Sequence, residues 1–261
     1  MTTTINIETI LKRDRAIVLT GLAAITTLSW IYMFYLAWQM EGMNSNMAMP
    51  MMQSWNSVDF LLMFLMWAVM MVAMMVPSVT PMVLMFATVN RKRREKDVPY
   101  VPTVVFVLGY LVVWCVFSIA ATSAQWGLHE AALLSPMMSS STPVLGGLLL
   151  ITAGIFQWTP MKDACLSHCK SPLGFIMTHW KEGQWGAFLM GLHHGAYCVG
   201  CCWALMALLF VNGVMNLLWI AVLAAFVLLE KVMHKTPWLS RVTGGLLVAW
   251  GLFMLVIAFS A

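Results

Sequence analysis

The most reactive side chains of this sequence gather in one otherwise apolar stretch between Gly191 and Trp203. Two histidines and three cysteines stand there, namely His193, His194, Cys198, Cys201 and Cys202. Residues three and four apart share a face of a helix, so His194 and Cys198 form one stripe that Cys201 or Cys202 continues. Thiolate and imidazole select soft or borderline ions such as Cu(I) and Zn(II). We interpret the stretch as a metal or redox site. The alternative is that the cysteines are small buried hydrophobic residues and the histidines make interhelical hydrogen bonds.

A second cluster lies between Pro160 and Pro172. On a short helix, Cys165, His168 and Cys169 would all face one way and offer three soft ligands. Their order differs from the c-type haem attachment signature, which ends in Cys-x-x-Cys-His, and no second ligand pair follows at zinc-finger spacing. The alternative is that they are ordinary reduced cysteines of a cytosolic surface.

Methionine is the third unusual feature, with 25 of 261 residues. One helix face is predicted to carry a ladder of four, at Met63, Met66, Met70 and Met74, with Met71 and Met75 beside it. Six more precede it, at Met40, Met43, Met47, Met49, Met51 and Met52. Thioethers select Cu(I) over harder ions, and a series of weak sites lets an ion pass. The alternative for the ladder is apolar packing by a flexible side chain.

Glu230 is a carboxylate expected within the membrane, four residues before His234. It could ligate a metal, orient an imidazole or relay a proton. An interfacial salt bridge to Lys231 is the alternative.

The elements that must position these residues are apolar helices. Hydrophobic residues make up 61% of the chain and charged residues 9%, and the mean hydropathy is +0.85. Crossing a bilayer takes about 20 helical residues. Seven runs are apolar enough to be read as spans, at 16–38, 58–76, 101–126, 144–157, 185–211, 217–233 and 242–258. The second run continues past Pro77 and Pro81, so we expect it to bend, tilt or leave the membrane near Pro77.

The positions of the basic residues predict the orientation of these spans. All 14 Lys and Arg residues fall within 12–15, 91–96, 162–181 and 231–241. Seven spans with a cytoplasmic N-terminus place every group inside, as the positive-inside rule requires, and leave the C-terminus in the periplasm. We therefore predict an all-α, polytopic membrane helix bundle in the bacterial inner membrane. It comprises a cytoplasmic segment, 1–15, and a single seven-helix transmembrane domain, 16–261. Nothing in the charge pattern suggests nucleic acid as a partner.

Four stretches of the sequence resemble a bacterial family of predicted metal-binding integral membrane proteins of unknown function. They are Met70–Pro77, Cys165–Gly174, Gly191–Met206 and Glu230–Lys231. The resemblance implies an association with metal over about 67–251. This chain has Lys170 where the family commonly has Arg, which retains the charge but loses a bidentate donor.

Three hypotheses follow. The first is Cu(I) handling, in which the outer methionines and the ladder pass copper to the cysteines and histidines, for transport or for delivery to a copper enzyme or periplasmic metallochaperone. The second is a membrane enzyme, either a copper or haem oxidase or oxygenase, or a thiol oxidoreductase. The third is an accessory subunit of a larger complex. Copper is the expected metal, ahead of zinc and haem.

Overall fold

The part of the chain that the structure describes consists of helices joined by short connections and contains no strand. In the computed structural model this part comprises residues 7–44, 55–94, 101–131, 133, 142–233 and 237–260. The helices are α1 (Ile7–Asn44), α2 (Ser57–Arg94), α3 (Thr103–Glu130), α4 (Pro143–Phe156), α5 (Pro160–Lys170), α6 (Pro172–His179), α7 (Gly183–Ala207), α8 (Leu209–Asn212), α9 (Leu217–Val232) and α10 (Pro237–Ser260). The predicted all-α class is confirmed.

The number of helices that could cross a membrane differs from the predicted seven. Among the described residues five are long and apolar enough, in α1, α2, α3, α7 with α8, and α10. A sixth is counted if α4 and α5, which meet at 66°, form one broken span. The remaining predicted span is α9, whose 16 residues reach roughly 24 Å at about 1.5 Å each. That is shorter than the roughly 30 Å hydrocarbon core, so helix length supports five or six crossings.

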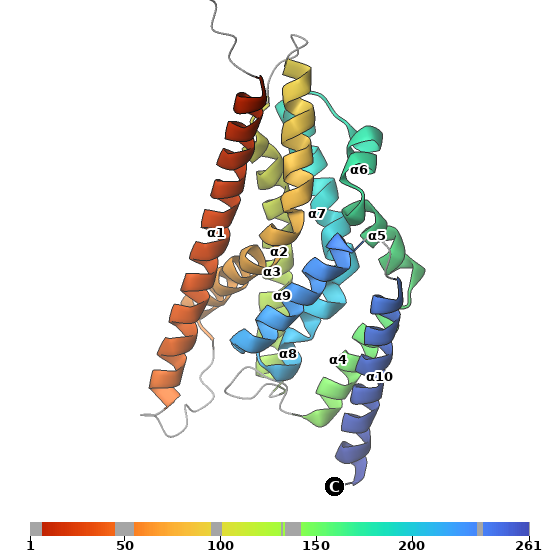
Figure 1. The fold of residues 1–261 in the computed structure, drawn as a ribbon. Helices are drawn as coiled ribbons and strands as arrows, with labels where there is room; N and C mark the ends of the chain where they lie inside the picture. The colour runs from red at the N-terminus through yellow and green to blue at the C-terminus, as the bar shows by residue number, and fades with distance from the viewer. Residues whose placement is uncertain are drawn as a thin grey trace, which may run out of the picture.

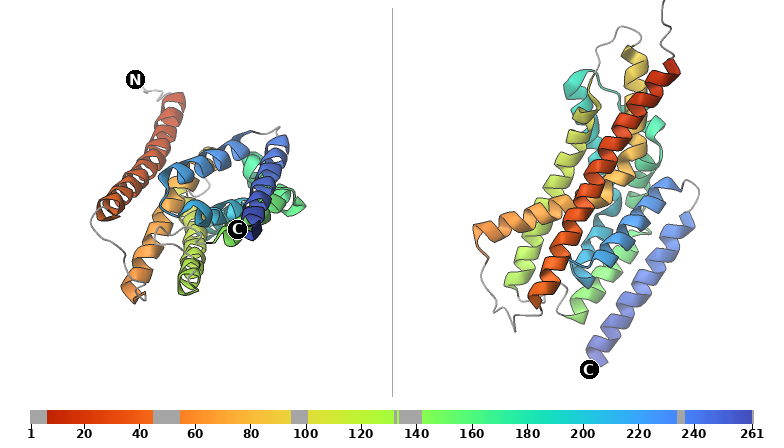
Figure 2. Two further views of the ribbon diagram at one scale, coloured as in Figure 1. Left: turned by 90° about the horizontal axis from the view of Figure 1, so that it is seen from below. Right: turned by 60° about the vertical axis from the view of Figure 1, so that its left-hand side comes forward.

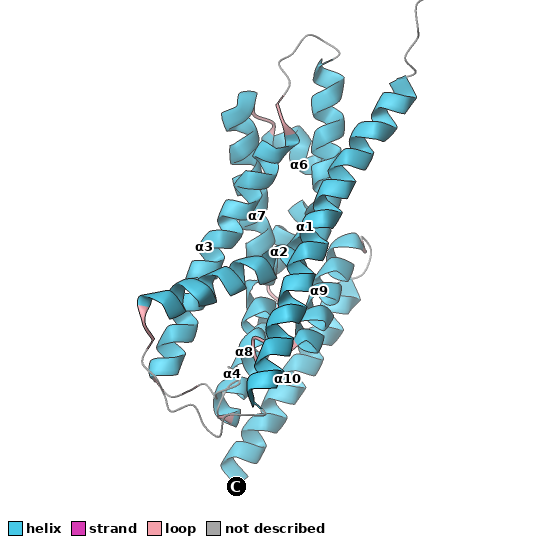
Figure 3. Ribbon diagram, turned by 90° about the vertical axis from the view of Figure 1, so that its left-hand side faces the viewer, coloured by secondary structure: helices cyan, strands magenta, loops and turns pink. Residues whose placement is uncertain are grey.

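The bundle has a central group of helices and two flanks. In Figure 1, α2, α3, α7 and α9 lie between α1 on one side and the pair α4 and α10 on the other, with α5 and α6 beside one end of α7. Figure 3 shows α1 lying across α2, which it contacts. The first helix begins at one end of the bundle, and the chain finishes at the other (Figure 1).

Helix α2 bends near its middle, so that its two halves run in different directions (Figure 2). It contains both Pro77 and Pro81. Proline removes a backbone donor and clashes with the preceding turn, which kinks a helix that contains it. The bend agrees with the expectation that this segment bends, tilts or leaves the membrane near Pro77.

Close glycine contacts hold the helix pairs together. A Cβ atom added at Gly191 of α7 would come within 2.1 Å of the Phe106 carbonyl oxygen, and one at Gly109 of α3 within 2.2 Å of that of Phe188. Helices α4 and α10 approach in the same way at Gly154. Small residues allow helix backbones to come this close in an apolar medium. The α3–α7 contact is the one that positions the cysteine-bearing helix.

Candidate metal centre

The two cysteine clusters, about thirty residues apart in the sequence, come together where α5 packs along α7. On α7, Cys198, Cys201 and Cys202 are all buried. On α5, the Cys169 thiol lies close enough to interact with those of Cys198 and Cys201. Cys165 reaches the same helix, because a Cβ atom at Gly200 would stand 2.9 Å from its Sγ atom. We call Cys169, Cys198, Cys201 and Cys202 the thiol cluster.

A lysine and a tyrosine contact the thiol cluster through Cys198. The buried ammonium group of Lys231, on α9, lies 2.9 Å from Cys198 Sγ and donates a second hydrogen bond to Ser78 Oγ at 3.0 Å. The hydroxyl of Tyr110, on α3, lies 3.2 Å from the same sulfur atom. Four helices therefore converge on one sulfur atom, and a positive charge stands beside it.

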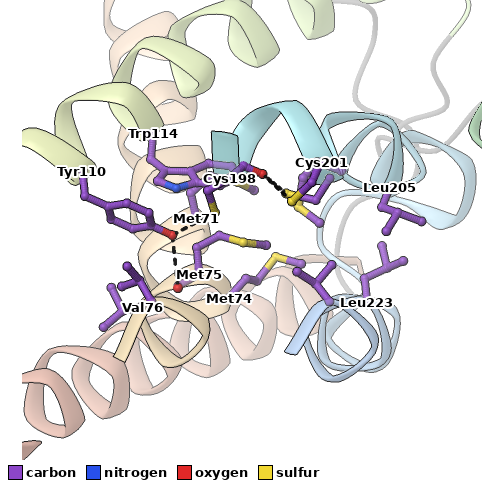
Figure 4. Packing of buried hydrophobic residues seen from close by; sticks show 14 of the residues in the cluster. Met71, Met74, Met75, Val76, Tyr110, Trp114, Cys198, Cys201, Leu205 and Leu223 are labelled. Atoms are coloured by element: carbon purple, nitrogen blue, oxygen red, sulfur yellow. Dashed lines mark hydrogen bonds between the residues drawn. The ribbon is translucent and has the colours of Figure 1, made fainter. Parts of the chain in front are cut away.

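Methionines of α2 face the thiol cluster. Met71, Met74 and Met75 are fully buried, and Figure 4 shows their side chains extending from α2 into the space occupied by Cys198 and Cys201. Because the thioether sulfurs approach from α2 and the thiols from α7, this space is lined by sulfur from both sides.

Of the predicted ladder, Met74 is the member seen to face the thiol cluster in Figure 4. Met66 and Met70 are also buried, whereas Met63 is half-buried and its sulfur accepts a hydrogen bond from Gln125 of α3 at 3.8 Å. Met71 and Met75, noted only as neighbours of the ladder, are the ones that join Met74. The side chains of the outer methionines, Met40, Met43, Met47, Met49, Met51 and Met52, lie outside the described residues.

The two adjacent histidines of α7 have different surroundings. His194 is buried against the rings of Phe106, Tyr110 and Phe175, and its Nδ1 atom has no hydrogen-bond partner within the described part. His193 is exposed. The hundred-degree turn per helical residue separates them, so the pair does not act as one ligand set.

His193 instead belongs to a group of imidazoles on the surface of α5, α6 and α7. The His179 ring centroid lies 6.2 Å from that of His193 and 6.0 Å from that of His168. His168 stacks on Tyr197 with centroids 4.1 Å apart. We call His168, His179 and His193 the surface histidine cluster. No role was predicted for His179, because its partners come from other helices.

Glu230 lies in a different polar network. Its carboxylate accepts hydrogen bonds from Lys162 Nζ at 2.6 Å and from Ser240 Oγ at 2.7 Å. Lys162 also donates to the Gln157 side chain. The structure thus pairs Glu230 with Lys162, on α5, where the sequence suggested Lys231. It does not bring Glu230 into contact with the thiol cluster.

The donors are not preset for a metal ion in this conformation. Across the residues described, no three or more His, Cys, Asp or Glu side chains are arranged to hold one ion as they stand. The Cys201 and Cys202 thiols donate to the Cys198 carbonyl oxygen at 3.1 and 2.9 Å, and the Lys231 ammonium group contacts Cys198. Ion binding requires the thiols to give up these contacts together with their protons.

The arrangement defines a helical, sulfur-rich protein whose donors are of the kind that suits soft or borderline metal ions. A family model described as PpoB2, copper chaperone, matches residues 64–254, which include every helix that contributes to the thiol cluster. The chain therefore belongs to the PpoB2 copper chaperone family, and copper is the metal with which the family is associated. No curated protein and no solved structure matches the chain.

Proposed function

We propose that this chain is an integral membrane chaperone that holds Cu(I) between α2 and α7 and hands it to a copper enzyme or a periplasmic metallochaperone. The observation that carries the proposal is the convergence of the thiol cluster with the thioethers of Met71, Met74 and Met75. Thiolates and thioethers together form a soft donor set that prefers Cu(I) to harder ions.

A location in the bacterial inner membrane fits the surface of the bundle. Large apolar side chains are exposed on α1, α9 and α10, among them Trp38, Leu218 and Phe259 at 79%, 78% and 81%. Such exposed apolar surfaces are rare on soluble proteins but are expected where a protein contacts the lipid bilayer. We propose that residues 16–261 form one membrane domain with seven passes, in which α9 and the broken pair α4 and α5 each count as one. The N-terminus would lie in the cytoplasm and the C-terminus in the periplasm.

Lys231 can compensate the charge of a thiolate when no metal ion is bound. A thiolate deep in an apolar bundle needs a compensating charge, and an ammonium group 2.9 Å from Cys198 Sγ supplies one. Incoming Cu(I) adds one positive charge, and a thiol that loses its proton to become a ligand removes one, so the net charge of the site is unchanged when one proton leaves for each ion bound. Such an exchange suits a protein that must release its cargo.

The remaining predicted ligands extend from the thiol cluster in two directions. Met63, Met66 and Met70 continue along α2 toward the outer methionines, whereas Cys165, His168 and His193 lie toward the basic, cytoplasmic face. His194 stands near the thiol cluster as a further donor, and Glu230 supports the helix that carries Lys231. A chain of weaker sites on either side of a stronger one would permit transfer without trapping the ion.

Metal analysis of purified variants tests this function. The double variant Cys198→Ser with Cys201→Ser should lose most bound Cu(I) while still inserting into the membrane. Cys115→Ser is the matched control, because Cys115 is an exposed cysteine of α3 away from the cluster. Equal copper content in the double variant and the control would refute the proposed site. A visible spectrum with a Soret band would support the haem enzyme alternative instead, and the absence of both copper and haem would support an accessory subunit.

The thioether contribution is tested separately. Replacing Met71, Met74 and Met75 together by Leu keeps the volume nearly constant, so stability should change by less than about 1.5 kcal/mol per site. Cu(I) affinity should fall, as measured by competition with a coloured Cu(I) chelator. Met177→Leu is the control, because Met177 is 75% exposed on α6. Unchanged affinity in the triple variant would show that the thiols alone bind the ion.

A further inference from the structure

A polar cavity lies apart from the thiol cluster, at the corner where α4 ends, α5 begins and α10 starts. Its volume is about 300 Å³, and it is lined by Gln157, Trp158, Asp163, Ser240 and Arg241. Residues 157–159 connect the two helices of the 66° bend without being helical themselves. Irregular backbone near a membrane is tolerated where it lines a polar cavity, so the bend and the cavity belong together.

A buried amide donor in the wall of this cavity lacks a partner. Gln157 is 2% exposed, and its Oε1 atom accepts a hydrogen bond from Lys162. Its Nε2 atom makes no hydrogen bond within the described part of the chain. Buried donors are normally satisfied, because an unmade bond costs the full desolvation of the group. The Nε2 atom is therefore an unpaired donor in the side chain of a residue that lines the cavity.

The charged residues of the cavity call for a ligand that carries both signs. Asp163 and Arg241 are both exposed and do not form an ion pair with each other. Arg241 suits an anionic oxygen group, and a guanidinium binds phosphate with particular geometric fit. Asp163 suits a cation that can donate hydrogen bonds. The hydroxyl of Ser240, whose proton is directed to Glu230, presents its oxygen as an acceptor.

The position of the cavity points to a lipid. Trp158, in the wall of the cavity, is 48% exposed and donates a hydrogen bond to the Arg241 carbonyl oxygen at 3.0 Å. Trp238, which lies on α10 with Arg241, is 57% exposed. Exposed tryptophans of membrane proteins concentrate at the level of the headgroups. The basic residues of this region place it on the cytoplasmic side by the same rule that orients the whole chain.

We propose that this cavity binds the headgroup of a phosphatidylethanolamine lipid, with the phosphate against Arg241 and Gln157 and the ammonium group against Asp163. An anionic lipid would leave Asp163 facing a negative charge. A choline headgroup has no N–H donor to offer the carboxylate. The bound headgroup would satisfy the orphaned amide of Gln157 and fix the corner between α4 and α5, on which the Cys169 helix is built.

Lipid retention by the full-length protein tests the site. The protein is reconstituted in nanodiscs with equal parts of phosphatidylethanolamine, phosphatidylcholine and phosphatidylglycerol, extracted into detergent, and its retained lipid is identified by mass spectrometry. Arg241→Gln and Asp163→Asn should each lower retained phosphatidylethanolamine about tenfold, the effect expected on losing one charged hydrogen bond. Arg93→Gln is the control, because Arg93 is another basic residue of the cytoplasmic side and pairs with Glu182.

Three outcomes would overturn the proposal. One is equal retention of phosphatidylethanolamine in the Asp163 variant and the Arg93 control. Another is preferential retention of phosphatidylglycerol, which would indicate attraction of anionic lipid to basic residues alone. The third is binding of soluble phosphoethanolamine as tightly as the lipid, which would identify a small-molecule site. Thermal unfolding of each variant, followed with a thiol-reactive dye, checks that the two exposed substitutions leave the bundle folded.

Discussion

Removing the carboxylate of Glu230 should destabilise the bundle strongly, because it leaves the ammonium group of Lys162 buried without its counter-ion. The side chains of Lys162 and Glu230 are 0% and 4% exposed, and their charged atoms are 2.6 Å apart. Breaking a buried pair by removing one partner costs about 3–5 kcal/mol. For a chain of this size each kcal/mol lowers the melting temperature by about 2–4 °C, so Glu230→Gln should melt roughly 6–20 °C lower.

The pairing itself is tested with a double-mutant cycle. Lys162→Met alone should cost a similar amount, because it leaves the carboxylate buried. Lys162→Met combined with Glu230→Leu removes both charges, and such replacements are often close to neutral. Some loss remains, since Ser240 and Gln157 each lose a partner. The double variant should therefore be at least as stable to unfolding as the less stable of the two single variants.

The assay is thermal unfolding in detergent with a thiol-reactive dye, which reports the exposure of the buried cysteines. Copper content, measured well below the melting temperature, separates structure from ligation. Glu230→Gln should retain its copper if Glu230 acts through Lys162, and should lose it if Glu230 is a ligand. Stability losses that simply add in the double variant would refute the argument that the two charges support each other.

Two further predictions concern helix packing. Gly191→Ala should destabilise the protein by about 1–3 kcal/mol or more, because the new Cβ atom would come within 2.1 Å of the Phe106 carbonyl oxygen. Gly127→Ala, on an open face with nothing within 4 Å, should instead stabilise the protein by about 0.5–1 kcal/mol. The same melting assay compares the two glycine variants, and equal shifts in melting temperature would contradict the packing argument. Trp67→Phe should cost about 1–3 kcal/mol, because it removes a buried 2.6 Å hydrogen bond to Gln125. A melting temperature equal to that of the unaltered protein would show that this bond is replaced by another.

The helical class could be predicted from the sequence because several apolar runs are long enough to cross a bilayer. In that apolar medium a helix satisfies its own backbone hydrogen bonds, and few other structures do. The number of membrane crossings could be predicted less well from the sequence. Residues 144–157 and 217–233 are as apolar as the other runs, but both runs are already shorter than the about 20 residues of a straight crossing, and α4 and α9 keep nearly the same lengths, 14 and 16 residues. Hydropathy measures how apolar a segment is, but it does not decide whether a short apolar helix crosses the bilayer alone or joins a neighbouring helix as one broken span.

The candidate site was partly accessible for a similar reason. Spacing within one helix predicted that Cys198 shares a face with Cys201 or Cys202, since the neighbours of a helical residue follow from the 3.6-residue turn. The approach of Cys169 to these thiols depends on how α5 packs on α7. Likewise, Met71 and Met75 stood beside the predicted ladder in the sequence, and their position near the thiols together with Met74 depends on how α2 packs in the bundle.

The residues Glu230 and Lys231 show why the chemistry of a pair depends on the surrounding bundle. As sequence neighbours of opposite charge they suggested a salt bridge to each other. On α9 they point about 100° apart, so Glu230 meets Lys162 of α5 and Lys231 meets Cys198 of α7. Each charge is therefore compensated by a group from a different helix, which ties α9 to both clusters of cysteines. If Cu(I) takes the place of the ammonium group beside Cys198, the displaced lysine keeps its other hydrogen bond. Ser78, which already accepts a hydrogen bond from it at 3.0 Å, lies on α2 next to Pro77. Copper binding would in this way be coupled to the bend of the helix that supplies the thioethers.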